Sequence, residues 1–102
     1  MASIITVKTS ETKDQQISLE LWQHVDGTLE LVEATNAQGC STRRVSLLSL
    51  EPYASVGAAL SVLSEALSQY GTKGLNLMLN FTSLLQSIDG NPSMTLDELP
   101  TW

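Results

Sequence analysis

Glu51–Gly71 reads EPYASVGAALSVLSEALSQYG, and this stretch decides the fold class. Its apolar residues recur at steps of three and four, which places them on one side of an α-helix of about five turns. Pro52 suits the first turn of such a helix, and Gly71 suits its end. The predicted apolar stripe consists of Tyr53, Val56, Leu60, Leu63, Leu67 and Tyr70. An amphipathic helix of this kind needs an apolar surface to cover, and a sheet formed by the preceding segments would supply one.

Residues 1–50 predict that sheet, because apolar and polar residues alternate in short runs separated by turn-forming segments. Strands are expected, in chain order, around Ile5 and Val7, then at 17–22, 29–32 and 43–50. The polar runs 9–16 and 36–41 are expected to be loops. The sheet is therefore predicted to be antiparallel, with three to four strands.

The hairpin around Asp26-Gly27 could adopt two registers. A two-residue turn would set Glu20 against Glu33, which places like charges opposite each other. A three-residue loop, Val25–Gly27 with Gly27 in the left-handed conformation, sets Leu21 against Leu31 and is favoured. The face toward the helix would then carry Ile17, Leu19, Leu21, Leu29 and Leu31. The outward face would carry Glu20, Trp22, His24, Glu30 and Val32.

Residues 75–88 fit either a strand or a second helix, since both periodicities are present. Their Leu and Met content and their length favour a helix. Thr95–Glu98 matches a capping box, so one short turn is expected in the tail before Trp102. The prediction is one α+β domain over residues 1–102: an antiparallel β-meander (1–50), a long amphipathic helix with a second helix on the same face (51–90), and a tail (91–102).

Composition limits the functions that the chain can have. Five Lys and Arg against eleven Asp and Glu give a net charge of −6, which disfavours binding to a phosphate backbone. Cys40 is the only cysteine, and the start of the chain lacks the charged and apolar regions of a signal peptide, so a cytoplasmic protein is expected. No window is apolar enough to span a membrane, and no metal-ligand or cofactor motif is recognisable.

His24, Asp26 and Cys40 are the only ingredients for a thiol nucleophile with a base. They fall in two different loops without any supporting motif, so the sequence predicts a non-enzymatic protein.

A protein–protein interaction module is the favoured function. Trp is common at interaction hot spots, and the acids around Trp22 suit a basic partner surface, as in a small acidic inhibitor or immunity-type protein. The predicted binding residues are Glu20, Trp22, Glu30, Val32 and Trp102. The simpler interpretation is that the N-terminal segment covers Trp22 and that the tail folds back over the core.

Two other functions are compatible with the sequence. A sheet-based binder of single-stranded nucleic acid would use Trp22, Arg43, Arg44 and Lys73. A homo-oligomeric structural subunit would use the strip of small residues on the first helix, which permits close approach of another helix. That strip comprises Ala54, Gly57, Ala58, Ser61 and Ser64.

Overall fold

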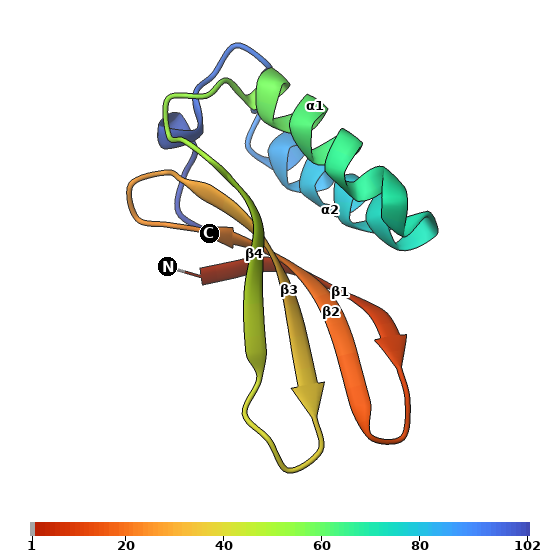
Figure 1. The fold of residues 1–102 in the computed structure, drawn as a ribbon. Helices are drawn as coiled ribbons and strands as arrows, with labels where there is room; N and C mark the ends of the chain where they lie inside the picture. Colours follow the sequence, from red (N-terminus) through yellow and green to blue (C-terminus); the bar gives the residue numbers. More distant parts are fainter. Residues whose placement is uncertain (1) are drawn as a thin grey trace.

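A computed structural model describes residues 2–102 as a four-stranded antiparallel sheet followed by two α-helices (Figure 1). The strands lie side by side in chain order: β1 (Ala2–Glu11), β2 (Gln15–Gln23), β3 (Leu29–Ala37) and β4 (Arg43–Leu50). The helices are α1 (Val56–Leu67) and α2 (Thr72–Ser87), with short 3₁₀ turns at Ser68–Tyr70 and Leu96–Glu98. This confirms the predicted α+β fold, and the sheet has four strands. Of the segment 75–88, which fitted either a strand or a helix, residues 75–87 belong to α2.

The predicted hairpin register is confirmed. Leu21 pairs with Leu31 and Trp22 pairs with Glu30 across β2 and β3. The three-residue loop is closed by the His24 amide, which donates to the Thr28 carbonyl at 2.8 Å, and Gly27 has a φ of 101°.

The two polar runs are shorter loops than predicted. β1 continues to Glu11 and β2 begins at Gln15, while β3 continues to Ala37. Figure 1 shows the reason: the β1–β2 and β3–β4 hairpin ends project beyond the helices, so both of their faces meet solvent. A strand exposed on both faces does not need the apolar alternation by which strands are recognised in sequence.

α1 begins later than predicted, at Val56, and is about three turns long. Ser55 is its N-cap, with an extended backbone and a side chain that accepts from the Ala58 amide at 3.1 Å. The preceding segment is held out of the helix because the carbonyls of Pro52 and Ala54 accept hydrogen bonds from the tail amides of Asp97 and Leu96, respectively. Tyr53, predicted to lie on the buried stripe, is therefore 77% exposed.

The main core lies between the sheet and the two helices, which cover the same face (Figure 1). In this core, every second side chain of the strands packs against one face of each helix. Leu96 and Leu99 of the tail cover one end of the core. The fully buried large side chains are Leu19, Leu21, Leu29, Leu31, Val56, Leu63, Leu67, Leu77, Phe81 and Leu96.

The tail folds back onto the sheet, as one of the two sequence-based interpretations expected. The capping box of Thr95 and Glu98 is present. Gln23 is buried, and its amide nitrogen donates to the Pro100 carbonyl at 2.9 Å while its amide oxygen accepts from the Trp102 amide at 3.1 Å. Trp102 packs against the core. Gln23 therefore ties the end of the chain to β2.

Candidate functional site

The sheet has a second face, opposite the helices, which we call the open face. No element within residues 2–102 is layered over it. The register places its side chains, because Glu20 pairs with Val32 and Val32 pairs with Ser46. Its central residues are Ser18, Glu20 and Trp22 from β2, Glu30, Val32 and Ala34 from β3, and Arg44 and Ser46 from β4.

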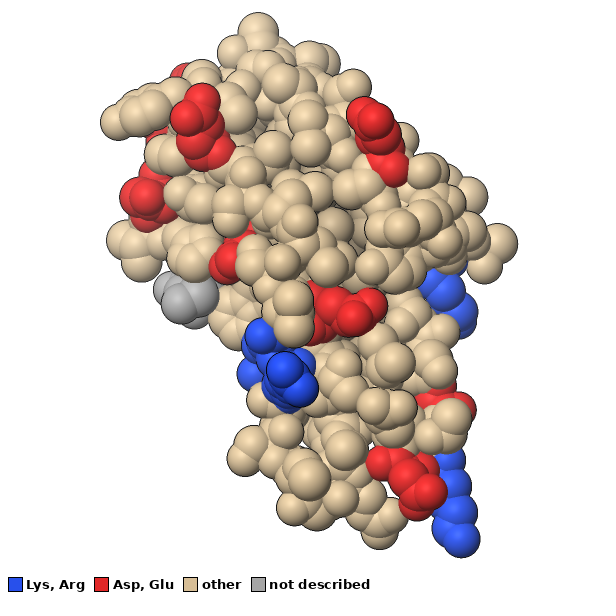
Figure 2. Space-filling model, viewed as in Figure 1, with Lys and Arg blue, Asp and Glu red and all other residues tan. Residues whose placement is uncertain are grey.

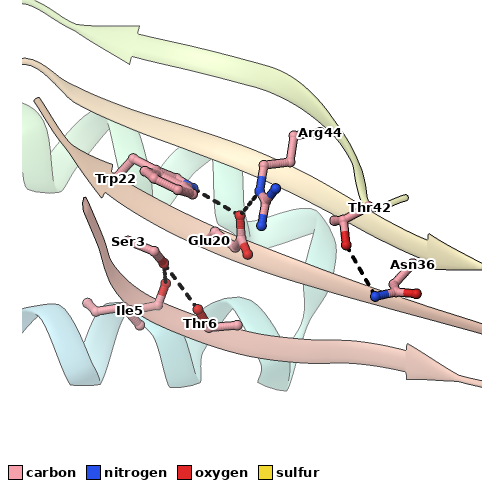
Figure 3. Close-up of polar contacts among 8 residues, drawn as sticks. All are labelled: Ser3, Ile5, Thr6, Glu20, Trp22, Asn36, Thr42 and Arg44. Atoms are coloured by element: carbon pink, nitrogen blue, oxygen red, sulfur yellow. Dashed lines mark hydrogen bonds and ion pairs between the residues drawn. The ribbon is translucent and has the colours of Figure 1, made fainter. Parts of the chain in front are cut away.

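A polar cluster occupies the centre of the open face (Figure 3). The Glu20 side chain is only 10% exposed, and one carboxylate oxygen accepts two hydrogen bonds. The Trp22 indole N–H donates at 2.9 Å, and the Arg44 Nε–H donates at 2.9 Å. The Arg44 guanidinium also lies 5.5 Å from the centre of the Trp22 ring, within the range of a cation–π contact. The cluster joins β2 to β4 across the intervening strand β3. The indole is held through its N–H by Glu20 and over one ring face by Arg44.

A second polar pair adjoins this cluster. His24 Nε2 lies 3.0 Å from the Glu30 carboxylate, and both side chains are about a quarter exposed, at 29% and 24%. The Ser46 hydroxyl, and after it the His24 ring, hold the pKa of Glu30 below its usual value of 4.5, although partial burial opposes them. Glu30 is therefore a carboxylate at neutral pH.

Two depressions run along these residues and share Glu30. One, of about 380 Å³, is lined by Trp22, Glu30, Val32, Arg44 and Ser46. The other, of about 580 Å³, is lined by His24, Val25, Asp26, Thr28, Glu30 and Ser49 and reaches the β2–β3 loop. Together they form a shallow groove from the centre of the open face to the end of the sheet.

We call the acids at this end of the molecule the acidic end: Asp26, Glu51, Asp97 and Glu98. Of these four residues, only Asp26 lines the groove. The β2–β3 loop and the tail meet here, since Gly27 lies directly against Asp97. Hydrogen bonds from the backbone at Thr28 and at Thr95 lower the pKa values of Asp26 and Glu98 respectively. In Figure 2 the charged side chains on the upper part of this view are all Asp or Glu, whereas Lys and Arg lie lower down together with further Asp and Glu.

The predicted binding residues are brought together except for Trp102. Trp22, Glu30, Glu20 and Val32 share the open face, but Glu20 and Val32 are only 8% and 5% exposed. The Glu20 carboxylate is occupied by its hydrogen bonds with Trp22 and Arg44, so it is not an exposed acid at the edge of a binding surface. Trp102 packs on the core side of the sheet through the tail. That these residues bind a partner stays a prediction.

The other candidate sets are divided by the fold. Of the proposed nucleic-acid contacts, Arg44 shares the open face with Trp22, whereas Arg43 alternates to the other face and Lys73 belongs to α2. His24 and Cys40 lie in loops at opposite ends of β3, about 30 Å of strand apart, so they form no nucleophile–base pair. On the small-residue strip, Ala58, Ser61 and Ser64 remain exposed and Gly57 faces Pro92.

Arg44 was not expected from the sequence to be a partner of Glu20. The two residues are 24 apart in the chain and on strands that are not neighbours, and β4 has an irregularity opposite Leu31 and Val32 that shifts its register. The sequence did indicate that Arg43 and Arg44 begin a strand. It does not show where β4 has its bulge, and without that position the alternation of side chains does not tell which arginine lies on the same face as Trp22.

Comparison of the chain with protein families, curated proteins and solved structures finds no match. Among residues 2–102, no group of three or more His, Cys, Asp or Glu side chains is arranged to hold a metal ion. In the same part of the chain, neither helix combines the length and the apolar composition that a membrane crossing requires.

Proposed function

We propose that the protein is a non-enzymatic binding module that recognises a basic surface of a partner protein through the open face and the adjoining acidic end. Trp22 is the anchor of this interaction, and Glu30 and Asp26 provide negative charge beside it. Such a module would act as an inhibitor or as an adaptor by occupying the surface of its target. Acidic complementarity would mainly raise the association rate.

The observation that carries this proposal is the fixed, half-buried indole on a face that the rest of the described chain leaves open. Trp22 is held by a hydrogen bond to Glu20 and by the Arg44 guanidinium above its ring. A side chain that is already ordered loses little conformational entropy when a partner covers it, so more of its contact energy appears as affinity. Tryptophans in such positions are common binding hot spots.

The proposal can be tested by capture followed by calorimetry. The immobilised protein is exposed to extract of its source cells, and each retained protein is purified and titrated against the wild type and two variants. Trp22→Ala removes the anchor, whereas Leu79→Ala is a matched control that removes an apolar side chain 58% exposed on α2. We expect a basic partner whose affinity falls by at least about 2 kcal/mol with Trp22→Ala only, and also falls as salt rises.

Unchanged affinity of a folded Trp22→Ala variant would contradict the proposal. Trp22→Phe keeps a ring under Arg44 but removes the N–H that Glu20 accepts, so it separates loss of contact area from loss of positioning. Thermal unfolding of each variant shows whether the fold is retained.

A further inference from the structure

We propose that the 380 Å³ depression on the open face accepts one lysine or arginine side chain of the partner protein, with the Glu30 carboxylate as its counter-ion. This inference rests on the proposed function and specifies which chemical group enters the site.

The walls of the depression suit a long cationic side chain. The Trp22 ring and Val32 offer apolar surface, and the Ser46 hydroxyl and the Glu30 carboxylate offer acceptors. Lysine and arginine characteristically lay their methylene stems along apolar surface while the charged group remains at a polar edge.

The charges around the depression favour a cation over an anion. Arg44 is already neutralised, because its Nε–H donates to Glu20 at 2.9 Å. Glu30 has no Lys or Arg partner in an ion pair among the described residues, and its hydrogen-bond partners are His24 and Ser46. With the imidazole neutral, Glu20, Glu30 and Arg44 together leave one negative charge at the site. An incoming ammonium or guanidinium would compensate that charge.

The test uses blocked tripeptides and the full chain, labelled with ¹⁵N. The indole N–H signal of Trp22 is identified with Trp102→Phe and followed during titration with acetyl-Gly-Lys-Gly-amide. Acetyl-Gly-norleucyl-Gly-amide, which has a similar stem without the charge, is the control peptide. Glu30→Gln removes the counter-ion, and Glu65→Gln on α1 makes the same change in net charge at an exposed site elsewhere.

We expect the lysine peptide to shift the Trp22 signal, the norleucine peptide not to do so, and Glu30→Gln to weaken binding roughly threefold, as for a partly exposed ion pair. Glu65→Gln should change nothing.

Three results would overturn the inference: no shift with the lysine peptide, an equal shift with norleucine, or equal effects of Glu30→Gln and Glu65→Gln. The proposed function fails differently. If the tripeptide does not bind but Trp22→Ala still abolishes binding of a captured partner, the binding module stands and the cation subsite is wrong. If the tripeptide binds but Trp22→Ala leaves partner binding unchanged, the depression does accept a cation, and the proposed binding module is wrong.

Discussion

Glu20 is a carboxylate in a place where a carboxylate is costly. It is 8% exposed on the open face, and burying an ionised group lowers stability unless hydrogen bonds and an opposite charge compensate it. Arg44 supplies the charge and a hydrogen bond, and the Trp22 indole supplies a second hydrogen bond. Each of the three groups therefore fixes the other two, and the orientation of the indole depends on a residue beneath it.

We predict that Glu20→Ala lowers the free energy of unfolding by about 1–2 kcal/mol, because the part-buried indole N–H loses its acceptor and Arg44 loses its partner. Glu20→Gln keeps an oxygen acceptor and should cost less. Glu65→Ala, an exposed glutamate on α1, should stay within about 0.5 kcal/mol of the wild type. Urea unfolding measures all three. Equal effects of the alanine substitutions at 20 and 65 would mean that the buried pairing contributes nothing net.

Among the elements, the β2–β3 hairpin is constrained both by its own turn and by the tail. Gly27 has a φ of 101°, a backbone conformation that residues with a side chain rarely adopt. A Cβ atom at this position would lie 2.6 Å from the Asp97 Cα. The Asp97 backbone cannot easily move away, since its amide donates to the Pro52 carbonyl at 3.0 Å. The loop, the tail and the start of the helical layer thus meet at one glycine.

We predict that Gly27→Ala lowers the free energy of unfolding by about 2–4 kcal/mol, the sum of backbone strain and a clash with main-chain atoms. Gly39 in the β3–β4 turn is the matched control: its φ is also positive, at 79°, but no atom lies within 4 Å of its Cβ position. Gly39→Ala should cost only about 1 kcal/mol. Chemical denaturation compares the two, and equal costs would show that the tail yields to the added methyl group.

The elements also show what the sequence could predict. The register around Val25–Gly27 followed from local charge and apolar patterning, because one buried face fixes a strand's register. The true start of α1 did not follow, since Pro52 and Ala54 are held by the tail, more than 40 residues further along. For the candidate site, the same-face placement of Trp22 and Glu30 was predictable. The contact of Glu20 with Arg44 required the β4 register, which a bulge shifts.

At the scale of the whole molecule, the sheet is longer than the helical layer that covers it. The principal extents are 43 × 26 × 21 Å, and the helices cover one end of one face (Figure 1). The tail seals the covered end: Leu99 is 7% exposed, and Gln23 joins the backbone at Pro100 and Trp102. The chain's last residues therefore serve the core, while the opposite face of the same strands stays open.

We predict that truncation after Glu98 lowers the free energy of unfolding by about 3 kcal/mol or more, because Leu99 and Trp102 lose their buried contacts and the buried Gln23 amide loses both partners. Thr101→Ala, at an exposed position between them, should have little effect. Urea unfolding provides the measurement. If truncation left stability unchanged but abolished binding of a captured partner, Trp102 would belong to the binding surface, as the sequence alone predicted, and the tail would have to leave the core to reach it.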